Sequence, residues 1–356
     1  MPSRTRKRRA RKAGAEKPQS AELVYLANLD SGITRKPGKR GFLYHDADGQ
    51  RITDRAELDR IAALAIPPAY TDVLISVDPN SHLQATGRDA RGRKQYRYHP
   101  EWSAGRGKTK FGQLPDFAAR LPKIREKVDT DLRLRKPGMD KALATVVWLL
   151  DNLYIRVGNT SYAEENGSYG LTTLRNRHVK IKGSSVHFNF KGKSGKEWCL
   201  SHSDRRITKA IRMLQELPGQ QLFQYLDEDG ERHAIRSQDV NAYIREASGA
   251  DFSSRQFRTW GATRMAATAL SVIEPGSSQR QVKQQVNDVI DSVAARLVNT
   301  RAVCRSAYIH PKVFADFENG ALAELAKMRP SRSETLTRWM DEDEIRVQRW
   351  LKKGGV

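Results

Sequence analysis

Cysteine is scarce in this chain: Cys199 and Cys304 are the two that occur in 356 residues. Two cysteines this far apart give neither a metal-ligand spacing nor a disulfide framework, which favours a reducing, intracellular compartment. No apolar run approaches the roughly 18 residues of a membrane span, and no apolar segment follows the charged N-terminus, as one would in a secretory signal. We therefore expect a cytoplasmic protein that does not associate with membranes.

Signatures of nucleotide and metal chemistry are missing too. Gly192-Lys193-Ser194 resembles the end of a phosphate-binding P-loop, but that motif needs glycine at position 187, where the chain has His187. The eight histidines form no HExxH or similar spacing, no carboxylate pair stands out as a two-metal site, and Gly-x-Ser-x-Gly is absent. We expect no nucleotide cofactor, no metal and no other cofactor.

Positive charge, by contrast, is abundant. The chain has 63 Lys and Arg against 41 Asp and Glu, a net charge of +22 and a pI near 10.1, which is typical of proteins that bind nucleic acid. The first 20 residues hold eight of these cations and one acidic residue, Glu16, so the remaining chain keeps a net +15. We interpret residues 1–23 as a disordered basic arm that either binds phosphates or is a solubilising or targeting segment.

The hydrophobic pattern predicts an α+β protein with two domains. A small β-rich domain is expected over residues 24–104, where Gly41–His45 should pair with Arg51–Thr53 and His82–Arg88 with Arg93–His99. Residues 104–108 are polar and contain glycines, as in a linker.

A larger, mainly α domain is expected over residues 105–356. In Met139–Tyr154, apolar residues recur at helical spacing. Residues 179–200 alternate apolar and polar side chains around two glycine-containing turns, which predicts a short β-hairpin or sheet within this domain. Further helices are expected at Arg206–Leu214, Ser237–Glu246, Arg258–Leu270 and about 282–297.

Four short segments of this larger domain supply what metal-free attack on a phosphodiester needs: a nucleophile, cations for the phosphoryl oxygens and an acid for the leaving group. They are Ile155–Asn159, Gly192–Gly195, Gln256–Trp260 and Cys304–Ile309. Together and in this order they resemble the type IB DNA topoisomerases, specifically the poxvirus-like branch that also occurs in bacteria. The resemblance includes Arg88–Tyr98 and runs from about residue 40 to near the C-terminus.

The resemblance implies that Tyr308 is the nucleophile, and that neighbouring cations help its phenol to lose a proton. Arg156 and Arg258 would clamp the nonbridging oxygens, since a guanidinium is permanently charged and its planar fork matches a phosphate.

Two further catalytic residues follow from the resemblance. Lys193, at the tip of an expected hairpin, would be the general acid for the leaving 5′ oxygen, with Lys191 and Lys196 as neighbouring alternatives. Asn299 stands nine residues before the tyrosine, where viral members have histidine. Its amide would donate to a phosphoryl oxygen, or it would be a helix cap.

DNA contacts are implied for Gln95, Tyr96 and Tyr98, which lie in a run of alternating basic and aromatic residues. Arg255 matches a basic position three residues before the second clamp arginine.

The interpretation is an isomerase that relaxes supercoiled double-stranded DNA through a 3′-phosphotyrosyl intermediate, without ATP or metal. We expect a monomer, associated with the nucleoid. One alternative is a tyrosine recombinase, although such enzymes usually carry histidine where Arg255 stands and have a helical N-terminal domain. The other is a non-catalytic architectural DNA-binding protein.

Overall fold

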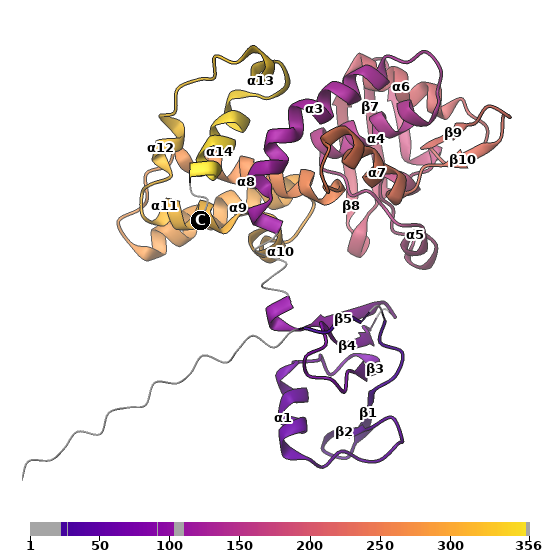
Figure 1. Cartoon of the computed structure of the whole chain (residues 1–356), viewed down its shortest axis with the longest axis vertical. Coiled ribbons are helices and arrows are strands. Elements are labelled where there is room, and N and C mark those ends of the chain that lie inside the picture. Colours follow the sequence, from indigo (N-terminus) through magenta and orange to yellow (C-terminus); the bar gives the residue numbers. More distant parts are fainter. Residues whose placement is uncertain (1–22, 27, 91, 103–109, 354–356) are drawn as a thin grey trace, which may run out of the picture. The chain divides into compact units, whose positions relative to one another are not determined.

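A computed structural model of the chain describes residues 23–26, 28–90, 92–102 and 110–353. The chain divides into two compact units, Met1–Thr109 and Lys110–Val356 (Figure 1). The first unit is built on a β-sheet and the second is mainly helical, so the predicted α+β class is confirmed. The expected basic arm up to residue 22 and the expected linker at 104–108 lie outside the described residues.

The first unit is a five-stranded antiparallel sheet in the order β2-β1-β3-β4-β5. Its strands are β1 (Ile33–Gly38), β2 (Gly41–His45), β3 (Thr71–Ile75), β4 (Leu83–Arg88) and β5 (Lys94–Tyr98). Helix α1 (Arg55–Ala63) begins at Asp54, whose carboxylate accepts the Glu57 amide. Ile61 of this helix packs with Ile33 and Ile75 of the sheet to form a small apolar core.

One of the two predicted hairpins is confirmed along its strands, and the other forms only next to its turn. β4 and β5 pair as expected, with Thr86 opposite Tyr96. β2 pairs along its length with β1. With the expected partner segment it forms one antiparallel bridge, between His45 and Arg51, and accepts the Ile52 amide at the Tyr44 carbonyl (2.9 Å). The turn after His45 does form, but the chain leaves it for α1 before a second strand is established.

The second unit is a helical bundle with two small sheets at one side. Its helices are α3 (Leu114–Leu132), α4 (Met139–Leu153), α5 (Thr160–Asn166), α6 (Arg205–Gln215), α7 (Ser237–Ser248), α8 (Ser254–Ser271), α9 (Gln279–Arg296), α10 (Arg301–Ala307), α11 (Pro311–Glu318), α12 (Ala323–Ala326), α13 (Glu334–Trp339) and α14 (Glu342–Lys353). Among the described helices, none combines the length and apolar character that crossing a membrane requires.

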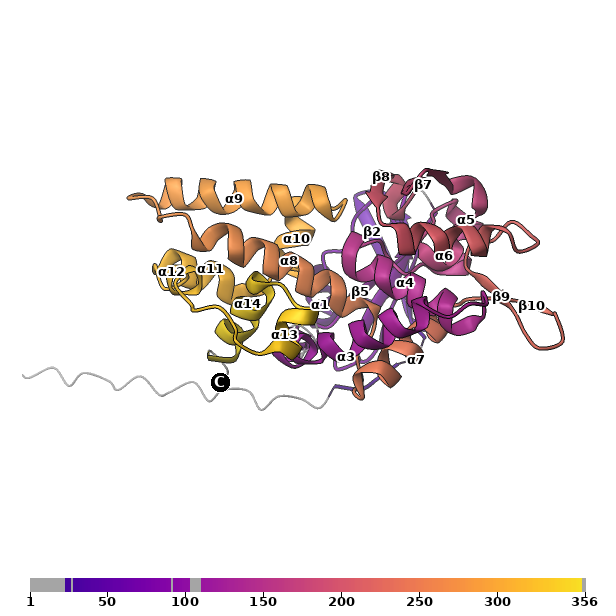
Figure 2. The same cartoon turned by 90° about the horizontal axis from the view of Figure 1, so that it is seen from above.

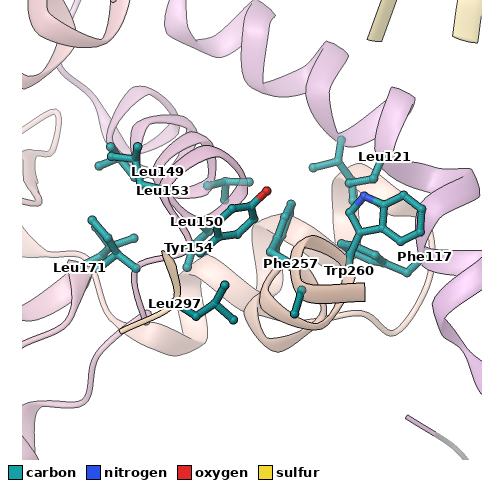
Figure 3. Close-up of a cluster of buried hydrophobic side chains, with 14 of the residues drawn as sticks. Phe117, Leu121, Leu149, Leu150, Leu153, Tyr154, Leu171, Phe257, Trp260 and Leu297 are labelled. Carbon is teal, nitrogen blue, oxygen red and sulfur yellow. The ribbon is translucent and has the colours of Figure 1, made fainter. Parts of the chain in front are cut away.

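Helix α8 lies at the centre of this unit and is buried on most sides. Figure 2 shows α9 running along it, and Figure 3 shows its Phe257 and Trp260 beside Phe117 of α3. The Phe117 and Phe257 rings meet edge to face, with centroids 5.1 Å apart. Because α8 carries two of the sequence-predicted functional residues, this packing fixes their position.

The predicted sheet in this unit is confirmed. β6 (Val179–Lys182), β7 (Ser185–Lys191) and β8 (Glu197–Ser203) form an antiparallel sheet in that order. Alternate residues of β7 are buried in the helical core, as the apolar alternation requires. The second sheet, β9 (Gln224–Leu226) and β10 (Arg232–Ala234), is a short hairpin.

A largely buried ionic network joins α3, α4 and α14 to α8. Arg125 of α3 donates to both oxygens of Asp151 (2.7 and 3.0 Å) and to both oxygens of Glu344 on α14 (2.7 and 2.8 Å). The Trp260 indole donates to the same Glu344 carboxylate at 3.1 Å. Burial alone would raise the pKa of Glu344, but the hydrogen bonds and charge of Arg125 lower it, so this carboxylate is ionised at neutral pH.

Removing one member of this network should destabilise the protein strongly. We expect Glu344→Ala to lower the free energy of unfolding by about 2–4 kcal/mol, because it leaves the Trp260 indole without its acceptor and the Arg125 guanidinium with the Asp151 carboxylate in place of two. Glu342→Ala removes an exposed ion pair with Arg346 on the same helix and should cost about 0–1 kcal/mol. Denaturant titration of both variants checks this; equal losses would contradict it.

Candidate active site

Tyr308 ends helix α10 and is half-buried. Its amide donates to the Cys304 carbonyl at 3.1 Å, closing the last turn. Thr263 of α8 holds the backbone on both sides of it: the hydroxyl donates to the Tyr308 carbonyl (3.2 Å) and accepts the His310 amide (3.1 Å). These two hydrogen bonds fix the backbone around Tyr308 to α8, and neither of them uses the phenol of the side chain.

Arg258 of α8 lies against that ring, with its guanidinium carbon 5.0 Å from the ring centroid. The side chain is 3% exposed and donates to two backbone carbonyls, those of Leu297 (2.9 Å) and Tyr154. Tyr154 follows α4 in the left-handed conformation (φ 56°, ψ 24°), which turns the chain immediately after the helix. Burial, and then repulsion from Arg156, lower the pKa of Arg258 to about 10, so it stays charged at neutral pH.

The backbone of the segment carrying Arg156 lies directly against the backbone of residues 170–172, and we call this contact the glycine crossing. The Leu171 amide donates to the Arg156 carbonyl (2.9 Å), and the Thr172 amide donates to that of the following residue (2.7 Å). Gly158 (φ +105°) and Gly170 lie so close that a Cβ on Gly170 would be 2.5 Å from the Gly158 Cα. The crossing therefore requires glycine, and it fixes where the Arg156 side chain starts.

Asn299 bonds directly to Arg156. Its Oδ1 accepts from Arg156 Nη2 at 2.6 Å; since a guanidinium can only donate, the amide oxygen must face it. The cap of α10 is Thr300, whose hydroxyl accepts the Val303 amide, and not Asn299. Asn299 Nδ2 and Arg258 Nε are buried and have no hydrogen-bond partner among the residues that the structure describes.

The arginines act electrostatically on the phenol. Burial raises the pKa of Tyr308, but the positive charges of Arg258 and Arg156 outweigh burial and hold the pKa below its usual range. The charge of Lys110 adds a smaller contribution in the same direction. The cluster thus favours loss of the phenolic proton, which a nucleophilic tyrosine requires.

Lys193 lies on a turn of the small sheet. It begins η3 (Lys193–Gly195), the turn between β7 and β8, and its side chain is exposed. The turn is anchored by Gly192, where a Cβ would lie 2.7 Å from the Trp198 indole. Of the neighbouring lysines, Lys196 is half-buried. Burial raises the pKa of the Cys304 thiol on α10, and the positive charge of Lys196 opposes this rise slightly.

The residues expected to bind DNA lie in both units. Tyr96 and Tyr98 are 43% exposed on one face of edge strand β5, with stacked rings 6.2 Å apart. Strand alternation turns Gln95 to the opposite face, where its amide donates to Asp89 (2.9 Å). Arg255 is exposed on α8, one turn before Arg258.

Sequence reasoning missed two groups at this site. Lys110 has its ammonium 5.2 Å from the Tyr308 ring centroid, and Thr263 clamps the tyrosine's backbone. Lys110 directly follows a polar segment that reads as linker, and Thr263 is one of many small residues on a buried helix. Neither carries a signal in the sequence.

The geometry agrees with comparisons to known proteins. Residues 99–333 match the family model described as eukaryotic DNA topoisomerase I, catalytic core, and residues 41–89 match bacterial DNA topoisomerase IB, N-terminal domain. The chain belongs to the type IB DNA topoisomerase family, and the predicted family is confirmed. It is an enzyme of this class that acts on double-stranded DNA, so the recombinase and architectural alternatives are not retained.

Individual relatives come from viruses and a fungus. DNA topoisomerase 1B of Acanthamoeba polyphaga mimivirus is 34% identical over 289 residues, which cover 79% of this chain and 86% of the relative. DNA topoisomerase I of Monkeypox virus is 23% identical over 218 residues, covering 55% and 69%. DNA topoisomerase 1 of Mycosarcoma maydis is 32% identical over 100 residues, covering 28% of this chain and 9% of the relative.

The glycine crossing gives a test of how Arg156 is positioned. Gly170→Ala should lower the free energy of unfolding by about 1–3 kcal/mol, because the methyl group meets backbone that cannot move aside. Relaxation of supercoiled DNA should slow by roughly 10- to 100-fold if Arg156 is displaced and acts as the family resemblance implies. Gly112→Ala is the control, since an added Cβ there meets open space. Parent-like relaxation by Gly170→Ala would exclude this role for the crossing.

Proposed function

We propose that the protein relaxes supercoiled DNA by cutting one strand transiently with Tyr308. The phenolic oxygen attacks the phosphorus of a phosphodiester, the bond to the 5′ oxygen breaks, and that oxygen takes up a proton. A 3′-phosphotyrosyl ester and a free 5′-hydroxyl result. The DNA beyond the nick rotates, and the hydroxyl then attacks the ester, which restores the strand and releases Tyr308.

The observation that carries this proposal is the pair of buried, unpartnered donors in the cluster around Tyr308, Arg258 Nε and Asn299 Nδ2. A buried donor without an acceptor costs about 1–3 kcal/mol, so native proteins keep few of them. A phosphoryl group placed for attack by Tyr308 would offer acceptors to both. The arrangement is what a site prepared for an anion requires.

The electrostatics of the cluster support the same role. Besides the Tyr308 phenol, the partners of Arg156 and Arg258 within the described part of the chain are an amide and two backbone carbonyls, which accept hydrogen bonds without cancelling the charge. Two permanent cations thus remain to stabilise the charge that develops on the phosphoryl oxygens.

For the proton on the leaving 5′ oxygen we propose Lys193, from its match to the family's Gly-Lys motif. Its exposed place on a turn allows the ammonium to meet a bound DNA backbone. Lys196 is the alternative that its half-buried position favours. The two candidates can be distinguished with Lys193→Ala and Lys196→Ala on a substrate that has a 5′-phosphorothiolate leaving group. Sulfur leaves without taking up a proton, so this substrate should restore the cleavage rate only of the variant that lacks the general acid.

Gln95, Tyr96, Tyr98 and Arg255 are proposed as DNA contacts. The exposed tyrosine pair on β5 offers stacked rings and hydroxyls to a sugar–phosphate backbone. The cluster around Tyr308 is assembled from one chain, which supports action as a monomer. We place this activity on the DNA of the nucleoid, without ATP or a metal ion.

Replacing the nucleophile should abolish chemistry but not binding. Tyr308→Phe should form no covalent DNA adduct and relax no plasmid, while its DNA affinity stays close to the parent's, because affinity comes mainly from phosphate contacts. Denaturing gels of labelled DNA after mixing with enzyme measure the adduct. Tyr225→Phe, on β9 and remote from the cluster, is the matched control. An adduct formed by Tyr308→Phe would refute the assignment.

Relaxation should proceed in excess EDTA and without nucleotide. The two guanidinium groups supply the positive charge, and the tyrosyl ester retains the energy of the phosphodiester bond, so neither a divalent ion nor ATP is needed for resealing. Magnesium is expected to speed turnover at most, by weakening binding of the product. Topoisomer ladders on agarose gels check this, and strict dependence on a divalent ion or ATP would overturn the mechanism.

A further inference from the structure

Lys110 is the first residue of the second unit, and its side chain lies against the backbone and ring of the nucleophile. Its ammonium donates to the carbonyl of Ala307, the residue before Tyr308. The same nitrogen is 5.2 Å from the Tyr308 ring centroid. One group therefore makes a hydrogen bond to the backbone of α10 and a cation–π contact with the catalytic ring.

The position of Lys110 is fixed by its neighbour. Phe111 is 9% exposed, and its ring meets that of His310 edge to face with centroids 5.3 Å apart. Residues on both sides of Tyr308 are thus in contact with residues 110 and 111. The hydrogen bond between Lys110 and Ala307 joins residues that lie 197 positions apart in the sequence.

The charges that face Tyr308 come from several elements. Arg258 on α8, Arg156 after α4 and Lys110 are the cations that lower its pKa against burial. On its own helix, the pKa of the Cys304 thiol is raised by burial, which keeps the thiol neutral. Next to it, burial lowers the pKa of His310 to about 4, so this imidazole is neutral as well.

More distant cations act through these groups. The charge of Lys196 acts on Cys304, and that of Arg255 acts on Lys110. Burial and Arg255 lower the pKa of Lys110, whereas the phenol of Tyr308 favours its charged form.

We propose, building on the proposed nucleophile, that Lys110 is a positioning residue for Tyr308 that fixes the end of α10 and adds a third positive charge beside the phenol. In the proposed function the two arginines bind the phosphate, whereas Lys110 contacts the tyrosine ring and the carbonyl of the preceding residue. Its charge therefore acts on the nucleophile itself, in attack and again when the phenolate leaves during resealing.

This role has a kinetic signature. A cation beside the phenol lowers the cost of the negative charge that its oxygen carries in the transition state, in whichever direction that state is crossed. Cleavage and resealing should therefore slow by similar factors when the charge is removed. Since Tyr308 is an uncharged phenol before attack and an ester afterwards, the equilibrium fraction of covalent complex should change little.

The experiment is single-turnover cleavage of a suicide duplex by the full-length enzyme, at saturating DNA and over a range of pH. At neutral pH, Lys110→Met should cleave roughly 3- to 30-fold more slowly than the parent. Removing a cation raises the pKa of the phenol, so the rise of rate with pH should move to higher pH and the deficit should shrink at alkaline pH. Lys110→Arg, which retains the charge, should keep the parent's profile.

Two further variants separate charge from structure. Lys110→Gln keeps a donor for the Ala307 carbonyl but removes the charge. Its cleavage rate should rise with pH at the same higher pH as that of the Met variant. If the Met variant folds poorly, the Gln variant alone tests the role of the charge. Lys127→Met removes a lysine that lies 5.0 Å from the ring centroid of Tyr243, remote from the site, and should cleave as the parent does across the pH range.

A deficit that is constant at every pH, or parent-like cleavage by both neutral variants, would overturn the proposal. A large change in the covalent equilibrium would also contradict it. None of these outcomes bears on the nucleophile itself, which stands or falls with the adduct test of Tyr308→Phe.

Discussion

Arg156 and Arg258 repel each other, and the rest of the candidate active site depends on the hydrogen bonds that keep these two like charges close together. The repulsion is one cause of the lowered pKa of Arg258. Their partners are neutral, an amide from Asn299 and two backbone carbonyls, so the charge is oriented but not cancelled. Arg125, buried in the same unit, shows the opposite arrangement, with two carboxylates that neutralise it. The first arrangement attracts an anion and favours ionisation of a phenol, whereas the second stabilises the fold.

Two of the five non-glycine residues with positive φ in the described part of the chain lie next to the groups that hold these arginines. Tyr154 and Val298 both adopt positive φ values, 56° and 49°, which cost side-chain-bearing residues about 1–3 kcal/mol each. The first presents its carbonyl to Arg258, and the second precedes Asn299. Both lie beside fully buried residues of the core, in which Tyr154 and Leu297 lie near Phe257 of α8 (Figure 3). Packing of this density offsets the local strain and keeps the site in one geometry.

Local signals predicted most elements and failed where a partner had to be chosen. The β4–β5 hairpin and the sheet of β6, β7 and β8 follow from alternation and turn residues, which act between neighbours in the sequence. The main partner of β2 was missed, because β1 reads Ile-Thr-Arg-Lys-Pro-Gly, and charged residues, proline and glycine are not typical of a strand. That segment becomes a strand because β2 and β3 pair with its two edges.

By itself the sequence determined the chemistry available: a basic chain with Tyr308, two arginines and an asparagine in the order of a known family. It could not determine which side chains meet. Tertiary structure decided that Asn299 accepts from Arg156 while Thr300 caps α10. It also brought Lys110 to Tyr308, since only the folded core closes a loop of nearly two hundred residues around α8. The sequence specifies the chemical groups that each side chain carries. Contacts between residues so far apart in the sequence form only when packing of the core offsets the entropy cost of closing the loop between them.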